Sequence, residues 1–254
     1  RVVCFQQCDC RADTMNLLCL SELLREYIAG TEFESKTYFA GGCVRDYLMQ
    51  GTTSVEPGDI DICIELKNGS MLLGEHLAMR QNGIITSRYP EFGTLKMIMQ
   101  GVTLELVTTR REVYRYPSRY PKVSFGSLRD DSMRRDFSIN ALFMDVCSMK
   151  VLDICGFGIQ DLEHGTIRCI GNPITRFRED PLRMLRALRF ALRFRFAYED
   201  ATWLAMKQCR DELSRLSHRF VNSEISKIQQ FCSRDELTKA IGQLGWGEAL
   251  SDYL

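Results

Sequence analysis

The sequence predicts an α+β fold over its first two thirds, a mixed β-sheet with flanking helices, followed by an all-helical portion. Short alternating or wholly apolar runs, which are typical of strands, recur up to residue 154. From about Thr175 onward, apolar residues at helical spacing replace them. We therefore divide the chain into a head of residues 1–172 and a helical segment of residues 173–254.

Composition bounds the class of protein. The 254 residues include 33 Lys and Arg against 33 Asp and Glu and are 45% hydrophobic, as in a globular protein without a net charge that attracts nucleic acid. No apolar run approaches the roughly 20 residues that cross a bilayer, and no signal-peptide layout opens the chain. Eleven scattered cysteines predict reduced thiols and a cytoplasmic location, with a zinc site at Cys4, Cys8 and Cys10 left open. We expect no membrane partner, and no protein partner is evident.

The predicted elements follow one another closely. Ser70 is expected to cap a helix that extends to Gln81. The segment Arg110–Arg129 is rich in charge, Tyr and Pro without periodicity, which predicts a long, mobile loop. The helical portion should break at Arg195–Ala197, around Ser217, and at Gly242 and Gly245. The other predicted elements are helices over Met15–Ile28, Val44–Met49 and Arg134–Ala141, and strands over Thr37–Ala40, Thr94–Met99, Val102–Thr108, Leu142–Val146 and Val151–Ile154.

Two aspartates one residue apart give the strongest chemical signal. The stretch Gly58–Ile64 alternates polar and apolar residues, which predicts a strand with Asp59 and Asp61 on one face. Like charges on one face repel unless a cation lies between them, and Mg²⁺ is the hard, oxygen-binding candidate. The other interpretation is a strand end with two solvated acids.

Three further features of the head suit chemistry on a phosphate. Gly41 and Gly42 lie between a strand and a helix, where a ligand can approach the backbone, and Arg45 adds a planar fork for phosphate oxygens. A tight turn with a surface ion pair would also explain them. Glu105 is an acid inside an apolar strand, and its partner could be a metal, an arginine or solvent. Arg135, in an arginine pair, suggests triphosphate binding, although an ordinary helical turn explains that pair better when it is taken alone.

A helix that begins at Pro181 carries a stripe of arginines. Asp180, Arg183, Arg186 and Arg189 recur every three residues and so lie along one side of this helix. Most charge stripes are solvated faces. Three arginines behind a single aspartate are nevertheless unusual for solubility alone.

Asp180 and Arg183 can in principle read a nucleobase. A carboxylate accepts a hydrogen bond from an exocyclic amine, and a guanidinium donates to a ring nitrogen. Cytosine and adenine both present an amine beside a ring acceptor, whereas guanine and uracil present a carbonyl beside a ring N–H. A fixed Asp–Arg pair would therefore accept C and A and reject G and U without a template.

These motifs, in this order, resemble those of the class II nucleotidyltransferases, which comprise tRNA CCA-adding enzymes and bacterial-type poly(A) polymerases. The matching stretches are Gly41–Asp46, Asp59–Asp61, Arg134–Ala141 and Glu179–Phe190. The resemblance runs from about Tyr38 to Phe196. It implies a nucleotidyltransferase head, then a helical neck that holds the incoming base and a short, partial body that contacts RNA.

The resemblance also implies roles for individual residues. Asp59 and Asp61 would hold Mg²⁺ and act in catalysis, with Glu105 as a third acid. Nucleotide contacts are carried over to seven positions: Gly42, Arg45, Arg135, Asp180, Arg183, Arg186 and Arg189.

The implied activity is the addition of CMP and AMP, from CTP and ATP, to the 3′ end of tRNA with release of pyrophosphate. Open alternatives are a CC-adding or A-adding member, a poly(A) polymerase, and a catalytically silent RNA-binding module. The segment Arg110–Arg129 resembles the mobile loop of A-incorporating members and favours complete CCA addition. Two departures from the family pattern are the insertion Thr52–Pro57 and the end of the chain at Leu254, where the family's body continues.

Overall fold

The computed structural model describes residues 16–50, 60–81 and 83–253, which form two compact units. Unit 1 contains the described residues up to 111 together with 123–131 and 142–154. Unit 2 contains residues 112–122, 132–141 and 155–253. Stretches before residue 173 join unit 2 because Phe137, Ile139 and Ile167 are buried in its core. The predicted head and neck division at residues 172 and 173 is a functional one and stays a prediction.

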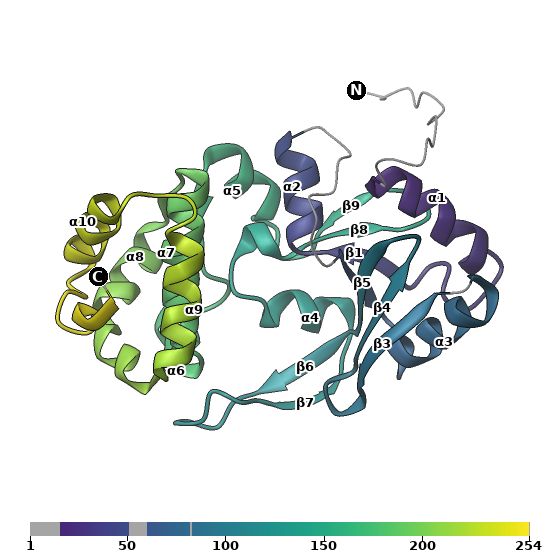
Figure 1. The fold of residues 1–254 in the computed structure, drawn as a ribbon, viewed down its shortest axis with the longest axis horizontal. Helices are drawn as coiled ribbons and strands as arrows, with labels where there is room; N and C mark the ends of the chain where they lie inside the picture. Colours follow the sequence, from purple (N-terminus) through teal and green to yellow (C-terminus); the bar gives the residue numbers. More distant parts are fainter. Residues whose placement is uncertain (1–15, 51–59, 82, 254) are drawn as a thin grey trace. The chain divides into compact units, whose positions relative to one another are not determined.

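A seven-stranded mixed sheet forms the centre of unit 1 (Figure 1). The strand order is β3-β4-β5-β2-β1-β8-β9, in which β2 and β5 pair in parallel and the other neighbours pair antiparallel. The predicted mixed sheet with flanking helices is thereby confirmed. The strands are β1 (Thr37–Ala40), β2 (Ile60–Ile64), β3 (Ile84–Tyr89), β4 (Thr94–Met99), β5 (Val102–Thr108), β8 (Leu142–Asp145) and β9 (Val151–Asp153).

Helices α1 (Leu17–Ile28), α2 (Gly42–Gln50) and α3 (Gly69–Gln81) flank this sheet. Helix α3 packs against β4 and β5, and a ring nitrogen of His76 in α3 lies 2.9 Å from the carbonyl oxygen of Tyr27 in α1. Gln100 and Gly101 join β4 to β5. Both residues have a positive φ, 50° and 79°. Two-residue turns with this backbone conformation match the twist of the strands in a β-hairpin.

Unit 2 is mainly helical around one apolar core. Short strands β10 (Thr166–Ile167) and β11 (Ala197–Tyr198) pair in parallel. Leu185 and Leu188, from the helix predicted to begin at Pro181, are completely buried together with Trp246. The helices are α5 (Gly158–His164), α6 (Pro173–Glu179), α7 (Leu182–Phe194), α8 (Asp200–Gln208), α9 (His218–Ile228) and α10 (Arg234–Leu244), with 3-10 turns at Ser138–Asn140, Arg210–Arg215 and Ser251–Tyr253.

The expectation that Arg110–Arg129 lacks regular structure is wrong. Strands β6 (Arg110–Val113) and β7 (Lys122–Phe125) form a two-stranded sheet, and helix α4 (Leu128–Arg134) starts within the same segment. Most side chains of β6 and β7 are exposed and the rest half-buried. Because no face of this ribbon is buried, the sequence shows no alternation of apolar and polar residues.

Three further boundary predictions are corrected. Ser70 lies inside α3, which begins at Gly69, and its amide donates to the Thr108 hydroxyl at 3.0 Å. The predicted helix over Arg134–Ala141 is absent: α4 ends at Arg134, and a 3-10 turn follows. Gly242 lies within α10, which ends at Leu244 and is capped by Gly245 with a left-handed φ of 71°.

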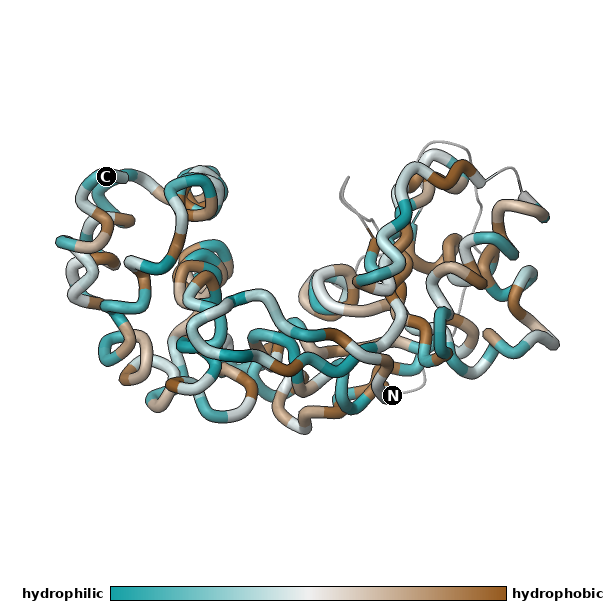
Figure 2. The backbone as a smooth tube through the Cα atoms, turned by 90° about the horizontal axis from the view of Figure 1, so that it is seen from below, coloured by the Kyte–Doolittle hydropathy of each residue, from teal (hydrophilic) through white to brown (hydrophobic). Residues whose placement is uncertain are grey.

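Apolar and polar residues are interspersed along both units (Figure 2). In the described part of the chain, no helix combines the length and the apolar character needed to cross a membrane.

Candidate active site

Strands β2 and β5 bring two predicted catalytic acids together in unit 1. The parallel register sets Asp61 opposite Glu105, and residues paired in this way project to the same face of a sheet. Ile60 and Ile62, on either side of Asp61, are completely buried, whereas Asp61 is half-buried. Because successive side chains of a strand point to opposite faces, Asp61 lies on the face opposite Ile60 and Ile62, as predicted for this strand.

The second predicted metal ligand, Asp59, lies outside the described residues. Within the described ranges, no three His, Cys, Asp or Glu side chains gather as a metal site would require. Glu105 forms an ion pair with Lys96, with 2.9 Å between the carboxylate and the ammonium. Asp61 and Glu105 are nevertheless hard oxygen donors on one face, and that donor class fits Mg²⁺.

The glycine turn lies beside the acidic strand. Gly41 has a φ of 71°, which glycine adopts without strain, and α2 begins at Gly42. The Cys43 thiol is 4.0 Å from the carbonyl oxygen of Asp61, so the start of α2 contacts β2. Arg45 is 4% exposed, and its Nε and Nη2 each lie 2.7 Å from a carboxylate oxygen of Asp46. The predicted phosphate-binding guanidinium thus has an internal partner.

The predicted base-reading pair lies in unit 2, where α6 gives way to α7. Asp180 terminates α6, and its carbonyl accepts a hydrogen bond from the Arg183 amide at 3.1 Å. Arg183 is 5% exposed, and its Nη2 donates to the Tyr114 hydroxyl and to the Arg134 carbonyl, each at 3.3 Å. Its Nη1 is buried without a hydrogen-bond partner. A buried donor left unpaired is costly, so this nitrogen is poised for an acceptor from a ligand.

The carboxylate of Asp180 is reached by the chain segment of residues 112–122. Arg119 Nε lies 3.0 Å from Asp180 Oδ1, and the Arg119 guanidinium stacks on the Phe220 ring with 4.2 Å to its centroid. Oδ1 also accepts a hydrogen bond from the Leu182 amide at 3.2 Å. Asp180 is therefore held in one orientation from two sides.

Arg186 has a carboxylate partner within the protein. Its Nε and Nη2 each lie 2.6 Å from Oδ2 of Asp136. Burial raises the pKa of Asp136, but the Arg186 guanidinium and the Asn140 amide outweigh it and lower that pKa to about 2. Asp136 therefore stays ionised, and Arg186 is tied to the turn that follows α4.

Arg189 and Arg135 are likewise engaged within unit 2. Arg189 Nε lies 2.9 Å from Glu224, which joins α7 to α9. Arg135 Nη1 donates to the Asn140 carbonyl at 3.2 Å. The structure thus brings Arg135, Asp180, Arg183 and Arg186 into one connected part of unit 2, while Arg189 links two helices there.

Sequence reasoning missed two residues of this cluster. The Tyr114 hydroxyl accepts from Arg183 and donates to Glu112 at 2.9 Å, and burial is the main cause that raises its pKa to about 12. Arg176 donates to the backbone carbonyls of Arg134 and Arg135. Tyr114 lies in a segment without periodicity. Arg176 could have been found as the arginine one helical turn before Asp180.

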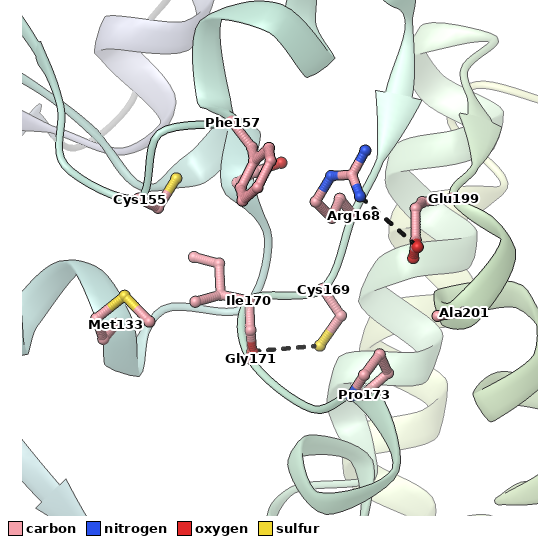
Figure 3. Close-up of a pocket in the computed structure, with 11 residues that line it drawn as sticks. Met133, Cys155, Phe157, Arg168, Cys169, Ile170, Gly171, Pro173, Glu199 and Ala201 are labelled. Atoms are coloured by element: carbon pink, nitrogen blue, oxygen red, sulfur yellow. Dashed lines mark hydrogen bonds and ion pairs between the residues drawn. The ribbon is translucent and has the colours of Figure 1, made fainter.

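A separate cavity of about 380 Å³ in unit 2 was not predicted either (Figure 3). Arg168 and Glu199, which line it, point toward each other, with 3.6 Å between a guanidinium nitrogen and a carboxylate oxygen, and the Arg168 guanidinium stacks on Phe157. Burial raises the pKa of the Cys169 thiol to about 12, so this thiol stays protonated and is a poor nucleophile. Of the described residues that line the cavity, none is a predicted site residue.

Comparison with known proteins agrees with these motifs. Residues 37–168, just over half of the chain, match the model of the Poly A polymerase head domain. An A-adding tRNA nucleotidyltransferase from Aquifex aeolicus is 39% identical over 176 residues, covering 68% of this chain and 20% of the relative. A CCA-adding enzyme from Staphylococcus saprophyticus is 32% identical over 218 residues, covering 82% of this chain and 49% of the relative.

The fold has close counterparts among solved structures. The Thermotoga maritima CCA-adding enzyme complexed with tRNA aligns with a TM-score of 0.75 at 26% identity, covering 91% of this chain and 51% of that one. The chain spans about half the length of that enzyme and of the staphylococcal relative. The chain belongs to the Poly A polymerase head domain family. The family resemblance predicted from the motifs is confirmed.

Proposed function

We propose that this chain is the catalytic portion of a template-independent tRNA nucleotidyltransferase. It adds CMP and AMP, taken from CTP and ATP, to the 3′ end of tRNA and releases pyrophosphate. The names of the similar proteins from Aquifex and Staphylococcus, and the tRNA bound to the Thermotoga protein, support tRNA as the substrate. A cytoplasmic location stays a prediction.

The observation that carries the proposal is the state of Arg183. Arg183 is 5% exposed, yet its Nη1 is buried without a hydrogen-bond partner, and the Arg183 amide is bonded to Asp180. A ring acceptor such as N3 of cytosine or N1 of adenine would satisfy that donor. The Asp180 carboxylate would then accept from the adjacent exocyclic amine. Uracil and guanine would leave both groups mismatched, which is a costly outcome in a buried site.

The remaining predicted residues act on the triphosphate. We assign Mg²⁺ to Asp59 and Asp61, with Glu105 on the same face as Asp61. A metal bound there would supply Lewis acidity, lowering the pKa of the attacking ribose hydroxyl and neutralising charge on the α-phosphate. Gly42 admits the triphosphate close to the backbone. Arg45 and Arg135 neutralise the charge of the departing pyrophosphate.

Incorporation of single labelled nucleotides tests this function. The chain is incubated with Mg²⁺, a tRNA that lacks its 3′-terminal CCA, and one labelled nucleoside triphosphate at a time. We expect CMP to be incorporated, AMP to follow once two C residues are present, and UMP and GMP to be rejected. Incorporation of CMP alone, or of AMP alone, would instead identify a partial-product member, and a long run of A a poly(A) polymerase. The absence of any Mg²⁺-dependent incorporation would contradict the proposal.

A further inference from the structure

We propose that Arg176 is the positioning residue that fixes Asp180 and Arg183 in the geometry needed to tell bases apart. The inference deepens the proposed function and rests on it. Arg176 lies on α6 and is not part of the arginine stripe of α7 to which nucleotide contacts were assigned.

The Arg176 guanidinium is buried and bonded on two sides. Its side chain is 11% exposed. Nη2 donates to the carbonyl oxygens of Arg134 and Arg135, the second at 3.1 Å, and Nη1 donates to the carboxylate of Glu179. Arg176 therefore clamps the backbone at the end of α4 to the end of α6.

One of these carbonyls is shared with the base reader. The Arg134 carbonyl oxygen also accepts a hydrogen bond from Arg183 Nη2 at 3.3 Å. A carbonyl oxygen has two lone pairs, and two guanidiniums use them here. Because Arg176 holds this carbonyl in place, it also determines where the Arg183 guanidinium is anchored.

The backbone of Arg176 contacts the other half of the pair. Its carbonyl oxygen accepts a hydrogen bond from the Asp180 amide at 3.2 Å, and the Asp180 carbonyl in turn accepts from the Arg183 amide at 3.1 Å. Arg176 is thus bonded to Asp180 through its main chain and shares an acceptor with Arg183 through its side chain. A single residue couples the proposed acceptor and donor of the reader.

The Arg176 and Arg183 guanidiniums are two buried cations that repel each other. Burial, and then the charge of Arg183, lower the pKa of Arg176, and Glu179 acts in the opposite direction. A lysine could not replace the fork, because an ammonium is a point charge that lacks the planar set of donors used here. Base discrimination depends on this fork, because an Arg183 guanidinium that is no longer anchored does not hold Nη1 toward the ring acceptor of cytosine or adenine.

The test compares Arg176→Lys with a matched control, Arg178→Lys. Arg178 lies on the same helix, but its side chain is 61% exposed and its Nε is 3.8 Å from Glu212. The affinity of the full chain for each of CTP, ATP, UTP and GTP is measured by equilibrium titration. Thermal unfolding of both variants is recorded alongside. A milder variant, Glu179→Gln, keeps all Arg176 donors and removes only the partner carboxylate.

We expect Arg176→Lys to weaken CTP and ATP binding and to leave UTP and GTP nearly unchanged, reducing discrimination about tenfold, which corresponds to roughly 1.4 kcal/mol. Glu179→Gln should reduce the ratio of CTP and ATP affinity to UTP and GTP affinity by a smaller factor, and Arg178→Lys should leave this ratio unchanged. If Arg176→Lys discriminates among the four nucleotides as the wild type does, the inference is overturned while the proposed function stands. If Arg176→Lys unfolds, the same result in Glu179→Gln overturns the inference. A wild-type chain without preference among the four nucleotides would overturn the proposed function as well.

Discussion

At the scale of single residues, the acids of the site differ in what surrounds them. Asp61 is half-buried on β2 with Glu105 in register beside it, whereas Asp136 is buried and bonded to Arg186. The first environment suits a ligand that brings positive charge, because two acids face the same side. Asp136 has its compensating cation in Arg186, and on the β2 and β5 face Glu105 is paired with Lys96. The roles we assign to these acids, catalysis and support, follow from that contrast.

Replacing Asp61 with Asn should remove catalysis while preserving the fold. The amide is similar in size but cannot supply a negative charge to a divalent cation, and such stabilisation is worth several kcal/mol. We therefore expect single-turnover incorporation of CMP to fall more than about 100-fold. The matched variant Glu105→Gln shows whether the neighbouring acid is a ligand or only the partner of Lys96. A rate near that of wild type in Asp61→Asn would rule out the metal role.

Asp136 should make unfolding stability depend on acid pH. Its folded-state pKa of about 2 lies below the ordinary value of 3.8, so its stabilising contribution is complete above about pH 4. That contribution is lost as the pH falls toward 2. Asp136→Asn should cost about 3 kcal/mol near neutral pH, because it leaves Arg186 without its carboxylate. In denaturant titrations, the difference in free energy of unfolding between wild type and Asp136→Asn should decrease from pH 4 to pH 2.

The control for this measurement is Asp211→Asn, since the Asp211 side chain is 91% exposed. It should unfold with nearly the wild-type free energy throughout that range. A gap for Asp136→Asn that stays constant between pH 4 and pH 2 would show that Asp136 is not an ionised partner of Arg186.

At the scale of elements, the sequence was informative wherever one face is buried. Strand β2 and helix α7 were predicted because Ile60 and Ile62, or Leu185 and Leu188, recur with the period of a buried face. Strand β3 was missed: its side chains are all exposed or half-buried, so its edge position leaves no clear alternation. The ribbon of β6 and β7 was missed for the same reason.

Local hydrogen bonds explain the error after α4. The Asp136 carboxylate accepts from the Phe137 amide at 2.8 Å and from the Asn140 side chain at 3.1 Å. Phe137 is extended, with φ of −129° and ψ of 151°. An Asp side chain that binds nearby backbone competes with the helical pattern, and apolar spacing alone does not reveal this competition.

The helix α10 offers a test of capping at this scale. The Ser233 hydroxyl accepts from the Glu236 amide at 3.2 Å, and the Glu236 carboxylate accepts from the Ser233 amide at 3.0 Å. Ser233→Ala should therefore lower the free energy of unfolding by about 1 kcal/mol in a denaturant titration. Ser251→Ala is the control, because its exposed hydroxyl donates only within the last turn. Equal stability of both variants would contradict the capping role.

At the scale of the whole molecule, the candidate site residues are distributed over both compact units. Gly42, Arg45, Asp61 and Glu105 belong to unit 1, whereas Arg135, Asp180 and the arginines of α7 belong to unit 2. The sequence pointed to these residues because all of them except Glu105 belong to short, ordered motifs. It could not identify Tyr114, since a hydrogen bond that spans 69 residues, from Tyr114 to Arg183, leaves no local pattern.

The central claim is that Asp180 and Arg183 select the base by its hydrogen-bonding edge. Asp180→Asn tests it most directly, because the amide can donate to the carbonyl of uracil or guanine where the carboxylate cannot. Asp200→Asn, an exposed position at the start of α8, is the control. We predict that the ratio of CMP and AMP to UMP and GMP incorporation falls at least about tenfold in Asp180→Asn, with a smaller change in the rate of CMP addition. An unchanged ratio would contradict the account.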